Sequence, residues 1–258
     1  LGSKRKENHA YLIPNRNTSK LLIMFNQLPQ VTKNIILLNI MFFVATWVLQ
    51  LQGIDLTASM GAHYVNSPLF KPYQIVTHFF MHGGFFHILF NMYLFAILGA
   101  YLEHIWGPKR FFVFYVASAL GAFALYNILG VYEISQLKSA IIAEGFNLDE
   151  INQLIINNNR NELLATNSGV VVQYASMCFT PIVGASGAIF GVMTAFAILF
   201  PNTEFRLYFA IPVKAKYFVA AYFLIEVYLS FQNNPNDNTA HLAHVGGAIV
   251  GAIIVLFW

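Results

Sequence analysis

The sequence has little charge for its length: only 10% of its 258 residues are Asp, Glu, Lys or Arg. A soluble domain averages about 25% charged residues. A chain of this size with so few charges cannot cover a globule with polar surface. The composition therefore excludes a disordered chain, a nucleic-acid-binding protein and an ordinary soluble enzyme.

Cysteine is nearly absent as well. With Cys178 as the single cysteine, no intramolecular disulfide can form, and zinc sites built on cysteine are excluded.

The basic residues at the start of the sequence are not followed by a short apolar stretch with a small-residue cleavage site, so we expect no signal peptide. Residues 1–3 do not begin with Met, and we expect them to be a remnant of cloning.

Apolar residues are what the chain has in excess, with 57% hydrophobic residues, 16% aromatic residues and a mean hydropathy of +0.59. Lipid cannot satisfy backbone N–H and C=O groups, so long apolar runs in a membrane must be helices. Six such runs are present: 35–51, 85–102, 111–129, 184–200, 217–231 and 241–258. The sequence predicts an all-α, polytopic membrane protein with six transmembrane helices.

The positions of the basic residues predict the orientation of these spans. If the N-terminus is cytoplasmic, the inner segments 1–34, 103–110 and 201–216 together hold 11 of the 14 Lys and Arg residues. Basic residues concentrate on the cytoplasmic side of membrane proteins. We therefore expect a cytoplasmic N-terminal segment, 1–34, a membrane domain, 35–258, and both termini on the cytoplasmic side of the inner cell membrane.

The connection 130–183 between the third and fourth spans is long, and it carries five acidic and two basic side chains. Gly145 is expected to end a short helix, and Asn147 to cap the next one, whose apolar face includes Ile151 and Ile155. We expect an extra helical insertion that rests on the bilayer or on the core of the protein. A platform for a substrate or partner is the alternative.

Three spans begin with strongly polar residues, which are costly in lipid and therefore suggest function. Each of these spans runs inward from the outer side. The polar side chains near their starts are thus expected at one depth, in the outer half of the bilayer: His87, Asn91, Ser186 and His244.

Small residues can bring two of these spans together. Gly187 and Gly191 lie four residues apart in the fourth span, as do Gly247 and Gly251 in the sixth. Pairs with this spacing let helix backbones approach closely in lipid. The hydroxyl and the imidazole on the two spans can then reach hydrogen-bonding distance.

These residue types support nucleophilic catalysis. Ser186 becomes a nucleophile when a base takes its proton, and the His244 imidazole, which titrates near neutral pH, is the candidate base. Attack on an amide creates an oxyanion that needs donors. The Ser186 N–H can supply one, and His87 and Asn91, which share one helix face, can supply two more.

No carboxylate lies within one helical turn of His244, so the sequence predicts a Ser–His dyad and not a triad. Asp237 in the preceding loop is not expected to join it. Glu226 inside the fifth span is interpreted as an interfacial side chain or a partner for a neighbouring helix. His82 is expected to shape the site or to bond a loop carbonyl, and His241 is expected to support the site or to organise water.

Taken together, these motifs resemble those of the rhomboid intramembrane serine proteases. Residues 184–187 are similar to the family's GxSG motif, 82–91 to its HxxxxHxxxN motif, and 243–247 to its sixth-span histidine motif, while 103–107 resembles its pattern after the second span. The resemblance covers about residues 35–258. Two departures are Tyr73-Gln74, where many members have Trp-Arg, and the long insertion.

The resemblance implies a rhomboid-like helical bundle with a defined set of site residues. It implies Ser186 as nucleophile, His244 as base, and His87, Asn91 and the Ser186 amide as the oxyanion hole. Phe190 would pack on the catalytic imidazole. Supporting positions are expected at Gly184, Gly187, Phe190, His82, His241 and Gly247. No cofactor and no metal are expected.

The sequence thus predicts an intramembrane endopeptidase that cleaves transmembrane-protein substrates near the outer surface, with lipid as its other partner and no nucleic acid. A metalloprotease would need HExxH, which is absent. One alternative is a catalytically silent rhomboid-like protein that only binds client helices. Another is a polytopic transporter, for which ionisable residues spread through the membrane depth would be expected.

Overall fold

The computed structural model describes residues 27–207, 211–232 and 239–258. Most of the expected N-terminal segment 1–34, and Asp237, therefore lie outside the described residues. The first half of the chain forms helices α2 (Gln30–Gln50), α3 (Leu56–Met60), α4 (Gln74–Thr77), η1 (His78–Phe80), α5 (Phe85–Leu94), η2 (Phe95–Gly99), α6 (Ala100–Trp106) and α7 (Pro108–Ala143).

The second half contains α8 (Leu148–Ile156), α9 (Arg160–Ala165), α10 (Gly169–Phe179), α11 (Ser186–Leu199), the short antiparallel pair β1 (Glu204–Leu207) and β2 (Ile211–Lys214), α12 (Ala215–Ser230) and α13 (His241–Phe257). Each of the six expected apolar runs forms a helix. Among the described residues, three helical stretches are long and apolar enough to cross a membrane: α2, the continuous stretch α5–α6 and α7. Helices α11 and α13 are apolar but shorter.

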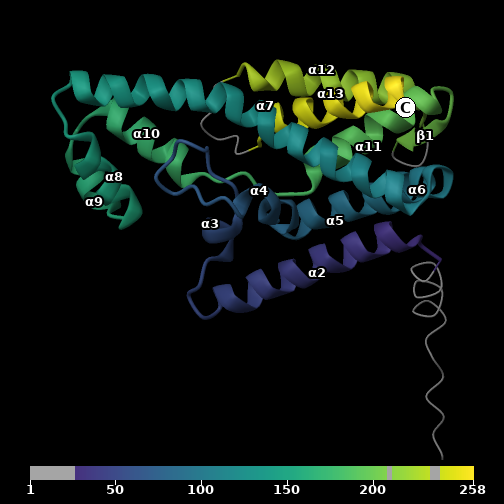
Figure 1. The fold of residues 1–258 in the computed structure, drawn as a ribbon, viewed down its shortest axis with the longest axis horizontal. Helices are drawn as coiled ribbons and strands as arrows, with labels where there is room; N and C mark the ends of the chain where they lie inside the picture. Colours follow the sequence, from purple (N-terminus) through teal and green to yellow (C-terminus); the bar gives the residue numbers. More distant parts are fainter. Residues whose placement is uncertain (1–26, 208–210, 233–238) are drawn as a thin grey trace, which may run out of the picture.

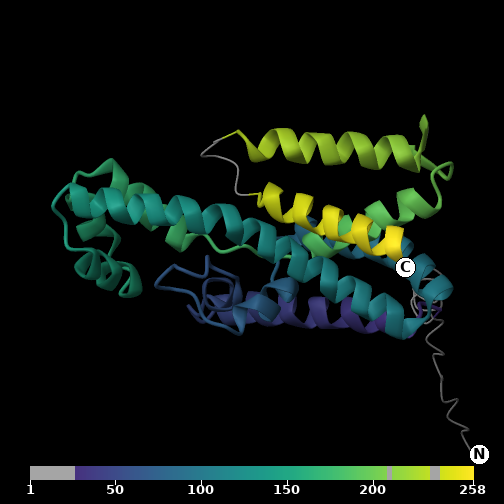
Figure 2. The ribbon, with the colours of Figure 1, turned by 45° about the horizontal axis from the view of Figure 1, so that its top comes forward.

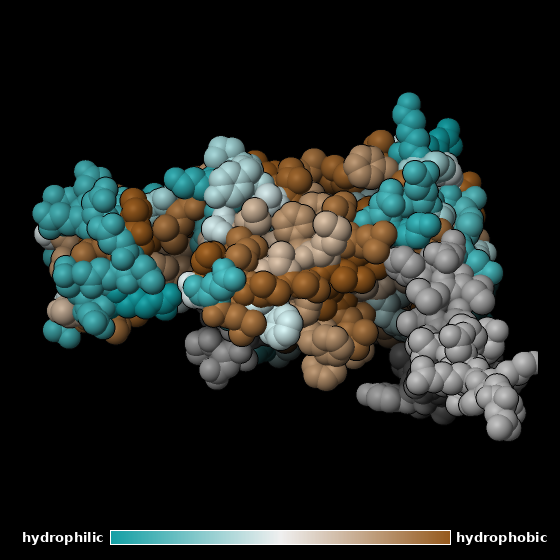
Figure 3. All heavy atoms as spheres, turned by 90° about the horizontal axis from the view of Figure 1, so that it is seen from below, coloured by the Kyte–Doolittle hydropathy of each residue, from teal (hydrophilic) through white to brown (hydrophobic). Residues whose placement is uncertain are grey.

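The helices form an elongated bundle (Figures 1 and 2). Helices α5, α11 and α13 run in the same direction. They end near α6, strands β1 and β2 and the C-terminus, so 103–110 lies at the same end as 201–207 and 211–216. Hydrophilic side chains gather at both ends of the molecule, and a hydrophobic stretch lies between them (Figure 3). This distribution is what a protein crossing a bilayer requires.

Helix α7 is longer than the sequence predicts. The expected third span ends at residue 129, but α7 is 36 residues long and continues to Ala143. It continues because Ile134, Leu137 and Ile141 extend one buried face through the last turns. The expected separate short helix before Gly145 is therefore wrong: Gly145, with φ +87°, follows the end of α7 itself.

Helices α8–α10 pack around the far end of α7 and share a small apolar core with it (Figure 1). Asn147 caps α8 as expected, accepting a hydrogen bond from the Asp149 N–H at 2.9 Å. The loop before α4 also contacts this part of α7: the Lys138 Nζ donates to the Asn66 carbonyl at 2.6 Å. The segment 130–183 therefore has its own packing and is tied to the loop beside the bundle.

The Glu103 side chain joins α6 to α2. Its two carboxylate oxygens accept from the backbone N–H groups of Val31 at 2.9 Å and Thr32 at 2.7 Å. These N–H groups have no partner within α2, and a negative charge suits a helix N-terminus. Gly107, with φ +77°, then turns the chain from α6 into α7. Residues 103–107 thus have an architectural role.

Helices α7, α11 and α13 approach so closely that side chains at several glycines are excluded. A Cβ added at Gly251 would lie 2.6 Å from the Gly191 Cα, and one at Gly191 would lie 2.5 Å from the Ser118 Oγ. A Cβ at Gly247 would overlap the carbonyl oxygen of Gly187. The predicted close contact between the fourth and sixth apolar segments is confirmed, and it fixes where α11 and α13 lie relative to each other.

Candidate active site

Ser186 is the first residue of α11, and the chain before it is held in place. Gly184 has φ +120°, a conformation that strains any other residue, and its N–H donates to the His78 carbonyl at 2.9 Å. Ile182 and Ala62 exchange two backbone hydrogen bonds, each 2.9 Å. The N–H groups of the first helical turn have no acceptor within the helix, so Ser186 presents both a hydroxyl and an N–H.

The structure brings Ser186 and His244 together although 58 residues separate them in the chain. The Ser186 Oγ lies 2.8 Å from the His244 Nε2. His244 is in the first turn of α13, and only 8% of it is exposed. The glycine contacts between α11 and α13 begin within the next turn of each helix, at Gly187 and Gly247. Backbone packing therefore sets the distance between the hydroxyl and the imidazole.

His244 has a carboxylate partner that the sequence analysis did not expect. The Glu226 Oε2 lies 2.9 Å from the His244 Nδ1, and Glu226 is only 3% exposed. The expectation of an imidazole without such a partner is therefore wrong. The interpretation of Glu226 as a partner for a neighbouring helix is correct. An acidic residue inside an apolar run was the available signal, but its partner is not adjacent in sequence.

His241, one turn before His244, also contacts this carboxylate. Its Nδ1 lies 2.6 Å from the same Glu226 Oε2. One ligand atom from each of Glu226, His241 and His244 lies within 4.8 Å of the others, so these three side chains are close enough to hold a metal ion. Each imidazole Nδ1 also lies at hydrogen-bonding distance from the carboxylate, so the cluster satisfies its own polar groups without a metal.

An aromatic ring covers the face of the His244 imidazole. The Phe190 ring stacks on it with centroids 4.3 Å apart and an interplanar angle of 13°. The Tyr222 ring of α12 packs in turn against the Phe190 ring, with centroids 4.9 Å apart. The aromatic contact implied for Phe190 is present, and it restricts the tilt of the imidazole plane.

Two further candidate donors come from α5. The His87 Nδ1 accepts from the Gly83 N–H at 3.4 Å, which leaves the proton on Nε2. A Cβ built on Gly184 would lie 3.0 Å from the His87 Nε2 and 3.5 Å from the Ser186 Oγ, so both atoms border the same small space. The Asn91 Nδ2 is buried and has no hydrogen-bond partner among the described residues. It is a donor without an acceptor.

These groups line one large cavity of about 870 Å³. Its walls come from α5, α11 and the segment before α11, together with Tyr222 of α12 and the first turn of α13. His87, Asn91, Ser186 and His244 all line it. A hydroxyl next to an imidazole, with several donors around the same space, is suited to acyl transfer.

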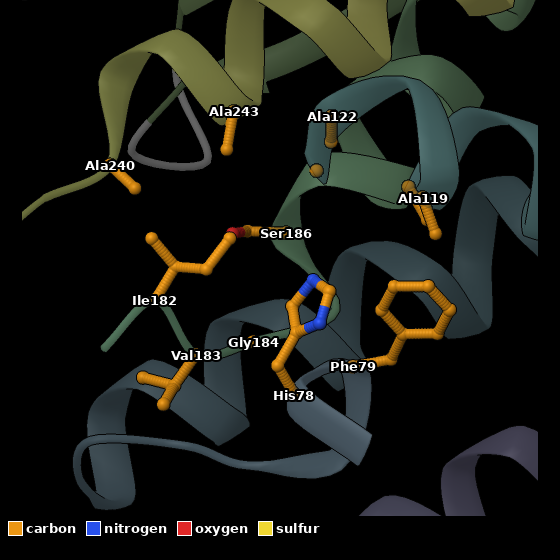
Figure 4. Close-up of a pocket in the computed structure, with 12 residues that line it drawn as sticks. His78, Phe79, Ala119, Ala122, Ile182, Val183, Gly184, Ser186, Ala240 and Ala243 are labelled. Atoms are coloured by element: carbon orange, nitrogen blue, oxygen red, sulfur yellow. The ribbon is translucent and has the colours of Figure 1, made fainter. Parts of the chain in front are cut away.

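A second, much smaller cavity of about 20 Å³ lies beside Ser186 (Figure 4). His78 and Phe79 lie on one side of it, and Ala240 and Ala243 on the other. The His78 Nδ1 donates to the Gln74 carbonyl at 2.7 Å, and burial lowers the pKa of His78 to about 4. His78 is therefore neutral at pH 7 and has a packing role.

His82 is the remaining histidine of this region. It is 4% exposed, and its ring packs edge-on against the His87 ring with centroids 5.0 Å apart. It does not contact the Ser186–His244 pair. His82 thus packs against a residue that lines the large cavity, and a role in shaping the site stays a prediction.

Comparison with known proteins gives a consistent family match. A model described as the Rhomboid domain matches residues 70–142 and 157–258. A protein of Schizosaccharomyces pombe, named as an uncharacterized mitochondrial rhomboid protein, is 42% identical over 79 residues, which are 30% of this chain and 20% of that protein. RHOMBOID-like protein 12, mitochondrial, of Arabidopsis thaliana is 29% identical over 181 residues, 70% of this chain and 45% of its own length. The chain thus matches less than half the length of either relative.

Proposed function

The chain belongs to the rhomboid family, and we propose that it is an intramembrane serine endopeptidase. In this proposal Ser186 attacks a peptide bond and His244 is the general base. The observation that carries it is the 2.8 Å contact between the Ser186 Oγ and the His244 Nε2 at the wall of the large cavity. Polar side chains inside apolar helices are costly and mark functional sites, so a hydroxyl–imidazole pair formed by two such helices favours a catalytic role.

The chemistry follows from the positions of the donors and acceptors. The His244 Nε2 takes the hydroxyl proton while the Ser186 Oγ attacks the carbonyl carbon. The oxyanion that forms accepts hydrogen bonds from the Ser186 N–H and from the side chains of His87 and Asn91. His244 then gives the proton to the leaving amine, and water releases the acyl group in a second cycle of the same steps.

The proposed substrate is a transmembrane segment of another protein. A helical amide is hydrogen-bonded and shielded, so the substrate must unwind before Ser186 can reach its carbonyl carbon. The cavity of about 870 Å³ has room for a short extended stretch of peptide. We therefore expect a preference for small and helix-breaking residues near the end of a substrate span.

We also propose six membrane spans, with both termini on the cytoplasmic side of the inner cell membrane. Helices α5, α11 and α13 run in a common direction, and 103–110 lies at one end with 201–207 and 211–216, which supports this orientation. The site lies at the opposite ends of these helices, so it would open to the outer side. The relatives' names describe those proteins as mitochondrial. Labelling of single introduced cysteines from each side of the membrane tests the orientation directly.

The activity is tested by reconstituting the chain in liposomes with a panel of single-span reporter proteins. We expect cleavage near the outer end of some reporters, located by product mass, and labelling by a fluorophosphonate probe. Ser186→Ala should remove both. A wild-type chain that binds reporters but neither cleaves them nor takes the label would instead be a silent client-binding protein. Reporter-independent solute flux would indicate a transporter.

A further inference from the structure

We infer that Glu226 of α12 positions the His244 imidazole and balances its charge, which extends the Ser186–His244 pair into a hydrogen-bonded chain of three groups. The inference rests on the proposed function, because it assigns Glu226 a part in the same reaction. Two contacts carry it: Glu226 Oε2 to His244 Nδ1 at 2.9 Å, and His244 Nε2 to Ser186 Oγ at 2.8 Å.

The first step of the argument concerns the tautomer of His244. An ionised carboxylate only accepts hydrogen bonds, so Glu226 requires the proton of the neutral imidazole on Nδ1. The lone pair is then on Nε2, where it faces the Ser186 hydroxyl. Phe190 cannot make this selection, because a stacked ring restricts the imidazole plane but not its rotation within that plane or its tautomer.

The second step concerns charge. When His244 takes the Ser186 proton it becomes a cation at a position that is only 8% exposed. A buried cation without a counter-ion is costly. The other titratable groups around it are His87 of α5, His241 of α13 and Tyr222 of α12. Of these groups and Glu226, only Glu226 is anionic at neutral pH, so Glu226 supplies the counter-charge.

The third step is that Glu226 is itself held in place. The His241 Nδ1 lies 2.6 Å from the same oxygen that His244 contacts. This second imidazole fixes the carboxylate against the first turn of α13. Glu226 is also one of only three buried residues of α12, with Ala215 and Val219. The polar contact is thus a main attachment of α12 to α13 at the level of the site.

A metal ion bound by the same three side chains would have the opposite effect. The ion would occupy the Nδ1 lone pair of His244, put the proton on Nε2 and leave no base for Ser186. The two arrangements therefore differ in their response to a chelator. The hydrogen-bonded arrangement predicts unchanged cleavage after treatment with EDTA, and stimulation by EDTA would overturn the inference.

The main test is Glu226→Gln, which keeps the size of the side chain and removes its charge. We expect kcat to fall by at least about tenfold, with KM within about threefold of the wild-type value, since loss of the equivalent carboxylate in a serine protease is known to cost up to about 10⁴. The acid limb of the kcat/KM profile should move to lower pH, because the anion that favours the imidazolium is gone.

Glu103→Gln is the matched control. Glu103 is an equally buried carboxylate, 3% exposed, but its oxygens accept from the α2 backbone. This variant can lower thermal stability, but it should leave the acid limb at its wild-type pH. A similar movement of the acid limb in both variants would show that the effect is not specific to Glu226, and would overturn the inference.

A second measurement does not depend on the folding or activity of the Glu226 variant. Proton NMR of the wild-type chain and of Ser186→Ala should show a strongly deshielded Nδ1 proton of His244, and its absence from both would overturn the inference. Full Ser186-dependent cleavage by Glu226→Gln, with an unchanged pH profile, would overturn it while the proposed function stands. A wild-type chain without cleavage or labelling would instead overturn the proposed function, even if the deshielded proton is present.

Discussion

Helix α13 contacts its two neighbours at the site in different ways. Toward α11 the contact is between backbones: Cβ atoms are excluded at Gly191, Gly247 and Gly251. Toward α12 the helices are farther apart, and a cavity of about 300 Å³ lies between α12 and the α11–α13 pair. On that side the carboxylate of Glu226 bridges to α13.

The difference separates two requirements of the proposed reaction. The tight contact sets the distance between the nucleophile and the base, which must stay within a few tenths of an ångström. The looser contact sets the tautomer and counter-charge of the base through a single side chain. It follows that the imidazole has its partner only while α12 lies against α13. The following predictions test the two contacts separately.

The largest effect is expected from removing either member of the tightly held pair. Ser186→Ala and His244→Ala should each lower cleavage by about 10⁴-fold or more, because neither attack nor proton transfer can proceed without them. Initial rates on one reporter measure the loss, and thermal unfolding in detergent checks the fold. Full activity of His244→Ala would contradict the assignment of the base.

A smaller loss of activity is expected from a substitution in α5, which forms another wall of the large cavity. Asn91→Ala removes the buried Nδ2 that has no partner among the described residues. We expect kcat to fall by about 10²–10³-fold, as for other oxyanion donors, with little change in KM. Single-turnover kinetics separate the two constants. A change in KM alone would indicate that Asn91 binds substrate and does not stabilise the oxyanion.

The backbone contact is tested by adding one methyl group to it. Gly247→Ala puts a Cβ against the Gly187 carbonyl, so α11 and α13 must separate. Overpacking of this kind costs about 1–3 kcal/mol, and we expect at least about a tenfold loss of activity with a lower Tm. Gly169→Ala is the control, because a Cβ there has no atom within 4 Å. Equal behaviour of the two variants would refute the packing argument.

The smallest effect is expected from filling the cavity between α12 and the α11–α13 pair. Ala220 lines the cavity between α12 and the α11–α13 pair, so Ala220→Leu fills existing space. We expect activity within about twofold of wild type and a slightly higher Tm, measured as for Gly247→Ala. A loss as large as that of Gly247→Ala would show that the two contacts of α13 do not differ in the proposed way.

Much of the site could be predicted because its signals are local. The high cost of polar groups in lipid made Ser186, His244, His87 and Asn91 stand out, and the glycine spacing predicted the α11–α13 contact. The end of α7 was not predicted, because Ile134, Leu137 and Ile141 are buried by helices that come later in the chain. The role of Gln74 was not predicted either. Its Oε1 accepts a hydrogen bond from the Lys71 N–H at 3.0 Å, which orders the loop.

The amino-acid order alone determined the helices and the candidate nucleophile and base. It could do so because their signals lie among residues that are close in sequence: apolar runs, small residues four apart and polar side chains at the starts of three spans. Glu226 is different. Glu226 and His244 are 18 residues apart in sequence and lie on different helices. Their contact depends on the rotation and height of α12 relative to α13, which are set by packing between the helices. Only the tertiary structure could therefore decide that a carboxylate completes the site.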